Sequence, residues 1–385
     1  MLPPHIGGIE TALTTLFAEL PEFQFTVLTA QPPSDALANL GPNVRIVHIP
    51  LEAFADVVVR RLLPRKHAGI RHVITFPIHE WARRSAASRL APEIVHMHSY
   101  AMFRRYAGMA TRHPDWPLGV FLDWLRDFGQ YPEPFLFTDH SLFAGPPELF
   151  HRVRNGLLLE RLREVVCVER SGLENVERFA REAGLPIRAR WIPNPVDVAL
   201  FRPAPLPSSD RVVIGYAARY EKEGFHEVLT LMEHAPDWVE FRLALAGSPE
   251  ERVSAAAILQ GAPAHVEWNV PNAQMARFYH SIHLLVDPFA FGAPRTACES
   301  LACGRIVVRL RRDRVSEDLP SSLSPVADAN DPASFYQLLE RLRRTPQLER
   351  MGLAARDYAE ETYSAKRVAE KYRAVYAEVA RPSEV

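Results

Sequence analysis

Short apolar runs typical of buried strands recur along the whole chain, and segments with helical spacing separate them. In the first half these runs are FQFTVLT, VRIVHIP, PEIVHMHS, FLFTDHS, EVVCVE and ARWIPN. A second series consists of RVVIGYAAR, FRLALAG, HVEWNV, HLLVDPF and RIVVRL. Strands that alternate with helices predict a parallel sheet with crossover helices, and two such series predict two doubly wound α/β domains.

A proline-rich segment separates the two series. Residues 192–210, IPNPVDVALFRPAPLPSSD, suit an extended linker better than a helix or strand. Beyond the second series, charged and aromatic residues recur at helical spacing from about Pro332 to Ala380, as in AEKYRAVYAEV. We expect one domain over residues 1–195, a second over 196–360 and a terminal helix within 361–385.

The composition indicates a soluble globular protein. Of the 385 residues 47% are hydrophobic, which is enough for two cores. No run of eighteen apolar residues occurs, and the start MLPPHIGGIETAL lacks the features of a signal peptide, so we expect a cytoplasmic protein. The cysteines Cys167, Cys298 and Cys303 are odd in number and lack zinc spacing, which disfavours both a disulfide framework and a zinc site.

The charges are balanced overall but unevenly distributed. A formal net charge of −1 argues against binding to nucleic acid. Residues 60–89 nevertheless hold seven arginines and one lysine against the single acid Glu80, with Phe76, Ile78 and Trp81 interleaved. This segment is either a solvated surface or a docking site for anionic lipid headgroups or an anionic acceptor, which would place the protein at the inner face of a membrane.

The segment from Phe289 to Val308, FAFGAPRTACESLACGRIVV, is the strongest candidate for chemistry. A Gly-Ala-Pro turn leads into a short helix with one acid, Glu299, followed by a glycine and a buried strand. Open α/β sheets bind nucleotides beyond the carboxyl ends of their strands, with phosphates at a helix N-terminus and a carboxylate on the ribose. Glu299 is therefore a candidate ribose ligand. The alternative is a solvated helix residue beside a core of Leu301 and Ala302.

Two histidines lie on one strand of the first series. His96 and His98 are two residues apart and so share a face. They are either hydrogen-bonded core residues or part of a metal site. No third ligand follows at a useful spacing, which makes zinc-dependent hydrolysis a weak hypothesis.

Five motifs occur together in an order and spacing known from one enzyme family. They are PPHIGGIETAL, PEIVHMHS, FTDHS, WIPNPVDVALFRP and ACESLACGRIVV. They resemble PP-x-x-GG-x-E, D-x-x-H-x-H, T-x-H, IPNGVD-x-x-x-F-x-P and EAMACG-x-PVV of the family 4 glycosyltransferases, which are retaining enzymes of the GT-B fold. Each motif alone is a weak signal, but the five together cover nearly the whole chain.

The resemblance implies an α/β protein of GT-B architecture. Two doubly wound, Rossmann-like domains would face each other across a cleft, and C-terminal helices would pack back toward the N-terminal domain. The implied reaction moves a sugar, with retention, from a UDP- or GDP-sugar to a saccharide, lipid-linked or natural-product acceptor held by the N-terminal domain. The nucleotide sugar is a co-substrate, and the resemblance implies neither a permanently bound cofactor nor a metal ion.

The resemblance also implies roles for side chains. Arg219 corresponds to the family's first basic residue, which balances charge on the β-phosphate of the leaving nucleotide. Lys222 corresponds to the second, although here Glu223, not the lysine, precedes the glycine; a salt-bridged surface lysine is the alternative. His140 corresponds to the histidine that contacts the donor sugar, with a structural hydrogen bonder as the alternative. Asp139 would lie near the reacting carbon.

The resemblance also implies a binding site for the diphosphate and the ribose. Gly7 and Gly8 precede a helix expected near Ile9, so their amides can approach a diphosphate, unless they form an ordinary helix-entry turn. The resemblance assigns Glu299 to the ribose. It assigns the lining of the diphosphate turn to Gly292, Ala293, Pro294, Arg295 and Thr296.

The chain departs from the family pattern at three places. Phe291 stands where the family carries a glutamate eight residues before the second acid, and loss of a hydrogen bond to a charged group costs about 1.5–3 kcal/mol. Pro195 replaces the usual glycine after PN, a minor change. The chain also begins at the prolines, without the apolar strand that precedes them in the family, so we hypothesise that the natural start lies upstream.

These departures leave other functions open. Phe291 and the shifted Lys222 are also compatible with a catalytically degenerate protein that binds a nucleotide sugar or stabilises an active partner. A sugar-nucleotide epimerase or a sugar phosphorylase of the same fold is a further alternative. The donor sugar, the acceptor and the oligomeric state have no transferable sequence code.

Overall fold

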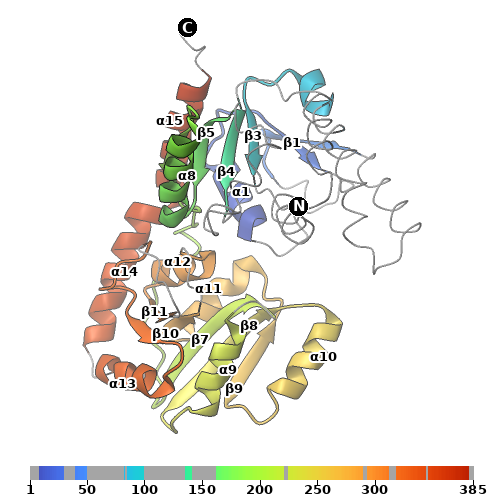
Figure 1. The fold of residues 1–385 in the computed structure, drawn as a ribbon. Coiled ribbons are helices and arrows are strands. Elements are labelled where there is room, and N and C mark those ends of the chain that lie inside the picture. Colours follow the sequence, from blue (N-terminus) through green and yellow to red (C-terminus); the bar gives the residue numbers. More distant parts are fainter. Residues whose placement is uncertain are drawn as a thin grey trace, which may run out of the picture. The chain divides into compact units, whose positions relative to one another are not determined.

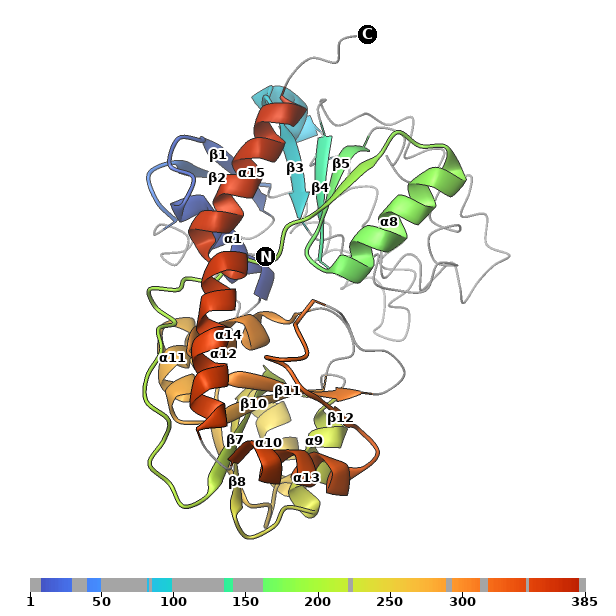
Figure 2. The same cartoon turned by 90° about the vertical axis from the view of Figure 1, so that its left-hand side faces the viewer.

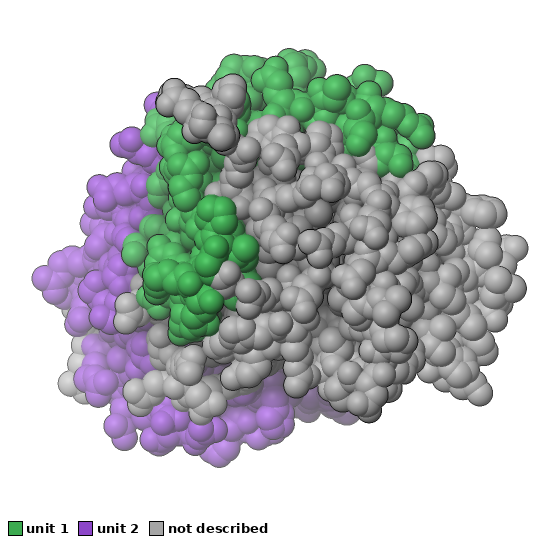
Figure 3. All heavy atoms as spheres, turned by 45° about the horizontal axis from the view of Figure 1, so that its top comes forward, with its two compact units in different colours: residues 1–193, 369–385 green, residues 194–368 purple. Residues whose placement is uncertain are grey.

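The chain folds into two compact units, coloured separately in Figure 3. Unit 1 comprises residues 1–193 and 369–385, and unit 2 comprises residues 194–368. The domains expected at 1–195, 196–360 and 361–385, with their roles, remain predictions. The structure is a computed structural model. It describes residues 8–29, 40–49, 82, 85–98, 135–140, 162–220, 224–288, 293–311, 318–343 and 346–380.

Unit 2 contains a sheet of six parallel strands (Figure 1). The strands are β7 (Val212–Arg219), β8 (Val239–Ala246), β9 (Ala264–Trp268), β10 (Leu284–Asp287), β11 (Ile306–Arg311) and β12 (Val326–Asp328). Their order is β12-β11-β10-β7-β8-β9. From the central β7 the chain adds β8 and β9 on one side, and then β10, β11 and β12 on the other. The direction of winding therefore reverses between β7 and β10, which makes this the doubly wound sheet that the sequence predicts.

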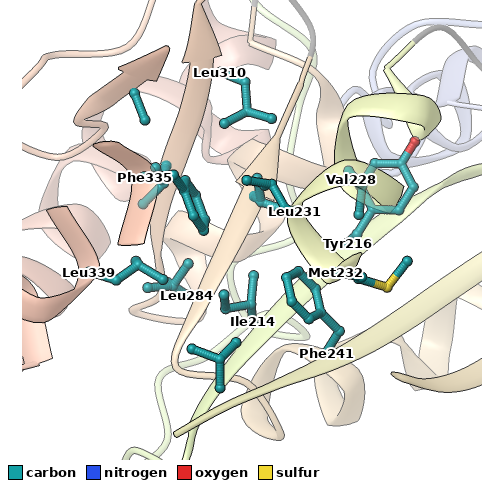
Figure 4. Close-up of a cluster of buried hydrophobic side chains, with 14 of the residues drawn as sticks. Ile214, Tyr216, Val228, Leu231, Met232, Phe241, Leu284, Leu310, Phe335 and Leu339 are labelled. Atoms are coloured by element: carbon teal, nitrogen blue, oxygen red, sulfur yellow. The ribbon is translucent and has the colours of Figure 1, made fainter. Parts of the chain in front are cut away.

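Alternate residues of β7 enter different cores, because successive side chains of a strand point to opposite faces. Ile214 and Tyr216 pack with helices α9 (Phe225–Glu233) and α13 (Pro332–Arg343), and Figure 4 shows this core. Val213 and Ala217 pack on the other face with α11 (Asn272–His280), α12 (Arg295–Ala302) and α14 (Gln347–Tyr363). Both faces of the sheet are thus covered, which explains why β7 is apolar without alternation.

Helix α10 (Pro249–Ile258) follows β8 and has a well-formed start. Ser248 accepts from the Glu251 amide at 3.2 Å, and the Glu251 carboxylate accepts from the Ser248 amide in return. Pro249 occupies the first helical position, where a missing N–H costs nothing. The sequence SPEE therefore fixes the point at which this helix begins.

The described residues of unit 1 form two parallel sheets. Strands β1 (Phe25–Thr29) and β2 (Val44–His48) pair with each other, and helix α1 (Gly8–Ala18) precedes them. A second sheet has the order β3-β4-β5-β6, with bounds Val95–His98, Phe135–Asp139, Leu162–Cys167 and Arg188–Trp191. The sequence predicts these strands and their parallel pairing.

Two helices cover opposite faces of the four-stranded sheet. Helix α8 (Arg170–Ala183) contributes Phe179 to a core with Phe137 and Cys167. The neighbouring residue Thr138 points to the other face, where its hydroxyl meets Tyr372 of helix α15 (Ala365–Val379). Both helices run alongside the strands in Figure 2. The C-terminal helix therefore packs back onto unit 1, as the GT-B resemblance implies.

The two segments that connect the units bond to each other within unit 2. Val196 pairs with Ser364 in a parallel bridge. The Val196 amide donates to the Tyr363 carbonyl at 2.7 Å, and the Ala365 amide donates to the Val196 carbonyl at 2.9 Å. Unit 2 thus begins and ends at neighbouring points. Among the described residues, none of the helices combines the length and apolar character needed to cross a bilayer.

Candidate functional site

Gly224, which follows β7, and Pro288, which follows β10, lie close together at the carboxyl edge of the unit 2 sheet. Gly224 has φ +98°, and a Cβ there would lie 2.5 Å from Cγ of Pro288. Only glycine accepts both the positive φ and this close approach. The loops that contain these two residues follow the strands between which the winding reverses, and doubly wound sheets bind ligands at such a point.

Glu299 lies in helix α12, which follows the second of these loops, and is 3% exposed. The Tyr279 hydroxyl donates to its Oε2 at 2.9 Å, and Nε of Arg295 lies 2.7 Å from its Oε1. Burial raises the pKa of the Glu299 carboxyl, while Arg295 and the Tyr279 hydrogen bond act in the opposite direction. Glu299 is therefore a buried and oriented acid and not a solvated helix residue.

Arg295 is the first residue of α12, one helical turn before Glu299. Its side chain is 10% exposed, and Nη2 donates to Asn272 Oδ1 at 3.3 Å. Its Nε is buried and close to Glu299, but the N–H is not aligned for a hydrogen bond. The structure thus shows this predicted diphosphate residue as the partner of the predicted ribose residue.

The other described residues of this predicted site lie in the turn before α12 and at the start of that helix. Ala293, Pro294 and Thr296 are half-buried. Pro294 is the N-cap of α12 and makes no side-chain capping bond, so no side chain occupies that helix N-terminus from the capping position. Gly292 lies outside the described residues, as does Phe291, which replaces the glutamate of the family pattern.

The basic residues of the prediction are only partly described. Arg219 is exposed at the carboxyl end of β7, next to the point where the winding reverses. Lys222 lies outside the described residues. Of the two glycines at the start of the chain, Gly8 begins α1, close to the position expected, and Gly7 is outside the described residues.

Asp139 and His140 follow each other at the end of β4 but have different neighbours. Asp139 is 2% exposed, and its Oδ2 lies 3.3 Å from the position that a Cβ on Gly172 would occupy, in the first turn of α8. His140 instead lies beside His98, with Nε2 3.4 Å from His98 Nδ1. The structure therefore does not bring the two predicted catalytic side chains of unit 1 together, because they belong to opposite faces of the strand.

His140 belongs to a larger cluster that includes His98 and His96. The His96 and His98 rings lie 3.9 Å apart between centroids. Burial lowers the pKa of His96 to about 3 and that of His140 to about 4, and it lowers the pKa of His98 well below its ordinary value. All three imidazoles are therefore neutral at pH 7 and can each donate one hydrogen bond and accept another.

Several polar residues near these sites lie outside the five motifs of the family. Tyr279 contacts Glu299, while Tyr372 and Tyr376 contact the histidine face of unit 1. The two tyrosines of α15 are four residues apart, so AEKYRAVYAEV contains the signal that places them on one helix face. No local signal marks Tyr279, because its partner lies twenty residues later in the chain.

A buried acid also ties α15 to unit 1. Glu164 of β5 is fully buried and pairs with Arg188 Nε at 3.2 Å and with Arg190, which in turn pairs with Glu378. Burial raises the pKa of the Glu164 carboxyl against the effect of the two arginines. Its partners on β6 and α15 give this acid a structural role. The described residues contain no group of three or more His, Cys, Asp or Glu that could hold a metal ion.

Comparison with known proteins relates this fold to glycosyltransferases. The chain is similar to a glycosyltransferase from Rickettsia africae ESF-5, with a TM-score of 0.62, 14% identity, and coverage of 100% of this chain and 98% of the other. It is also similar to Anabaena HepE in complex with UDP-glucose, with a TM-score of 0.63, 11% identity and 98% coverage of both chains. These similarities establish the α/β fold of the GT-B glycosyltransferases.

Sequence comparison relates part of the chain to a curated protein. No family model matches the chain. A curated relative, one of the subunits of the phosphatidylinositol N-acetylglucosaminyltransferase of Arabidopsis thaliana, is 26% identical over 216 residues. That alignment covers 54% of this chain, and the chain spans about half (48%) of the length of that relative.

Proposed function

We propose that this protein is a glycosyltransferase that moves a sugar from a nucleotide-diphosphate sugar, with UDP or GDP as the nucleotide, to an acceptor hydroxyl. The bond from the anomeric carbon to the β-phosphate oxygen breaks, and a bond to the acceptor oxygen forms on the same face of the sugar. The acceptor proton passes to the departing phosphate. The anomeric configuration is therefore retained, and no step requires a metal ion.

One observation carries this proposal: Glu299 is a buried, oriented carboxylate beside the winding reversal of the unit 2 sheet. A carboxylate has two oxygens and several lone pairs, so Glu299 can accept from a ribose diol while it keeps Tyr279 and Arg295 as partners. The fold is shared with HepE, whose structure contains UDP-glucose. Both points favour a nucleotide sugar as the ligand of unit 2.

The departing diphosphate requires positive charge and N–H donors. Arg219 at the end of β7 would supply a fixed charge, with Lys222 as a second cation. The N-terminus of α12 and the turn from Gly292 to Thr296 would supply backbone amides, and those of Gly7 and Gly8 would add to them. Protein groups of this kind stabilise the charge that develops on the leaving group.

Unit 1 is assigned to the acceptor and to the sugar. His140 would position the donor sugar as a neutral hydrogen-bonding group, and Asp139 would act near the reacting carbon. The acceptor is a saccharide, a lipid-linked compound or a small natural product. We assign the protein to the cytoplasm, with residues 60–89 as a peripheral contact to the inner face of a membrane.

Titration calorimetry with a panel of UDP- and GDP-sugars, and with UDP and GDP alone, tests the donor assignment. We expect binding of at least one nucleotide sugar. Glu299→Gln should weaken that binding about 10- to 100-fold, because a charged hydrogen-bond acceptor for the ribose is lost. The control Glu267→Gln changes a more exposed acid on β9, paired with Arg277, and should leave affinity unchanged. Failure of the whole panel to bind would reject the proposal.

A second candidate is a noncatalytic nucleotide-sugar-binding or partner protein of the same fold. It is favoured by Phe291, which stands where the resemblance implies an acid for the sugar hydroxyls. Product analysis with saccharide and lipid acceptors separates the two candidates. Transfer of the sugar supports the enzyme. Binding of the donor with neither transfer nor hydrolysis supports the noncatalytic protein. Phe291→Glu should then increase sugar affinity if only this acid has been lost.

A further inference from the structure

A row of hydrogen-bonded side chains crosses the α15 face of the unit 1 sheet. His96 bonds through Nδ1 to the Tyr376 hydroxyl at 2.9 Å and through Nε2 to the Thr138 hydroxyl at 2.7 Å. Thr138 in turn bonds to the Tyr372 hydroxyl at 3.2 Å. Two strands and the C-terminal helix thus share one row of polar groups in a buried part of unit 1.

The two bonds of His96 have only two consistent arrangements of hydrogen atoms. A neutral imidazole carries one N–H and one lone pair, so His96 donates at one nitrogen and accepts at the other. If Tyr376 donates to His96, then His96 donates to Thr138, and the bond between Thr138 and Tyr372 can run in either direction. If His96 instead donates to Tyr376, then Thr138 donates to His96 and accepts from Tyr372. Each hydroxyl therefore helps to fix the tautomer and the ring orientation of His96.

His96 is in turn in contact with the rest of the histidine cluster. Its ring lies 3.9 Å from that of His98, at an angle of 41°. His98 then meets His140, with His98 Nδ1 3.4 Å from His140 Nε2. In either tautomer, Nε2 is the His140 nitrogen that His98 engages. Within the described residues Nδ1 of His140 makes no hydrogen bond, so this nitrogen is available to a ligand.

We propose that His98 is a positioning residue for His140, and that Tyr372 and Tyr376 of α15 support it through Thr138 and His96. This inference rests on the proposed function, in which His140 contacts the donor sugar. His98 holds His140 Nε2, so that Nδ1 meets a sugar oxygen in a fixed orientation. The C-terminal helix thereby acts on the reaction without touching the substrate.

Nitrogen NMR of histidine-labelled protein tests the arrangement without any substrate, because ¹⁵N shifts report which ring nitrogen carries the proton. The His140 signals are assigned by their loss in His140→Gln. We expect one His140 tautomer in the unaltered protein at pH 7. His98→Ala should shift both His140 nitrogens, whereas His98→Asn, which keeps a polar group near the Nδ1 position, should restore most of the original shifts. His265→Asn on β9 is the matched control and should change neither nitrogen.

Tyr376→Phe tests the support from α15 and also serves if His98→Ala fails to fold. It removes one hydroxyl and should shift the His96 nitrogens strongly and the His140 nitrogens weakly. Tyr358→Phe, which removes a tyrosine hydroxyl bonded to the Asp318 carbonyl in unit 2, is the control and should shift neither. Unchanged His140 nitrogens in both His98→Ala and Tyr376→Phe would overturn the proposal, as would an equal mixture of His140 tautomers in the unaltered protein.

Kinetics with UDP-glucose, or with the donor that calorimetry identifies, supply the functional result. A positioning role predicts that His98→Ala lowers kcat about 10- to 100-fold while the donor KM changes less than about twofold, because a misplaced group costs mainly in the transition state. His98→Asn should recover most of kcat. An unchanged kcat in His98→Ala would overturn the proposal. If no nucleotide sugar binds at all, the proposed function fails, and the NMR result alone decides whether His98 orients His140.

Discussion

The four-stranded sheet of unit 1 and the six-stranded sheet of unit 2 have buried polar groups near them that are stabilised in different ways. In unit 1, histidines, a threonine and tyrosines share hydrogen bonds as neutral groups. In unit 2, Glu299 is buried beside the cation Arg295 and accepts a further bond from Tyr279. The difference shows two ways in which a titratable side chain can be buried: it becomes neutral, as the histidines do, or it stays charged beside a group of opposite charge, as Glu299 does. A neutral network should respond to pH, whereas an ion pair should respond to the loss of one partner.

Acidification should produce the largest effect and should act mainly on unit 1. An unfolded histidine binds a proton near pH 6.5, but folded His96 and His140 do so only near pH 3 and 4, and folded His98 well below the ordinary value. Below pH 6.5 the unfolded state therefore binds more protons than the folded state. The stability that the three neutral histidines contribute is complete above pH 6.5 and is lost as the pH falls toward 4. Between pH 6.5 and its folded pKa, each histidine lowers the free energy of unfolding by about 1.4 kcal/mol for every pH unit of acidification.

Hydrogen exchange at pH 7, 6 and 5, corrected for the intrinsic exchange rate, measures this loss in each unit separately. Unit 2 should lose less, because His283 is the described histidine of that unit whose pKa is lowered, by burial and by Arg305. His140→Gln should reduce the pH slope of unit 1 by about one proton. Equal slopes in the two units would show that the histidine cluster is not held neutral.

Removal of the cation in unit 2 should have the next largest effect. Arg295→Met leaves Glu299 buried without its ion-pair partner, and loss of one partner of a buried pair costs about 3–5 kcal/mol. Urea denaturation should show this loss at pH 7, with partial recovery in the double variant Arg295→Met, Glu299→Leu. The control Arg277→Met breaks an exposed pair with Glu267 and should cost less than about 1 kcal/mol. Similar losses in both variants would contradict a buried, coupled pair.

Tyr279→Phe should have a smaller effect in the same place. It removes a hydrogen bond to a charged acceptor, worth about 1.5–3 kcal/mol, and should raise the pKa of Glu299 further. Unfolding of unit 2 by urea gives the first quantity. The pH dependence of nucleotide-sugar binding gives the second, since affinity should begin to fall at a higher pH than in the unaltered protein. No change in either quantity would mean that Tyr279 does not hold Glu299.

Thr138→Val, in unit 1, should have the smallest effect. It removes a neutral hydroxyl that bonds to both His96 and Tyr372, and each neutral hydrogen bond typically contributes about 0.5–1.5 kcal/mol. Hydrogen exchange of unit 1 measures the loss. A larger loss than in Tyr279→Phe would reverse the order and show that the neutral network is the more tightly coupled of the two.

The regular parts of the fold are predictable from the sequence because their signals are local. The apolar run of β7 and the SPEE start of α10 indicate their elements without help from distant residues. In unit 1 the sequence likewise indicates the strands and their parallel pairing, but apolar runs alone do not give the register in which neighbouring strands pair.

The candidate site shows the same division between local and distant signals. Glu299 is marked by its own helix and by the glycine after it, so the sequence identifies it as a candidate. Its ion pair with Arg295 spans one turn of that helix and could have been read from the spacing. Tyr376, however, reaches His96 across 280 residues of sequence. No local pattern contains such a contact, because it exists only after the C-terminal helix has returned to unit 1.

That return has a consequence for how the protein is made. All residues of unit 2 precede Ala369 in the chain, and the bonds of Val196 to Tyr363 and Ala365 close that unit. The unit 1 strands emerge from the ribosome first, but Thr138 and His96 lack Tyr372 and Tyr376 until the residues after 368 follow. The first unit therefore cannot complete its polar row until residues from the far end of the chain are available, although its strands are synthesised first.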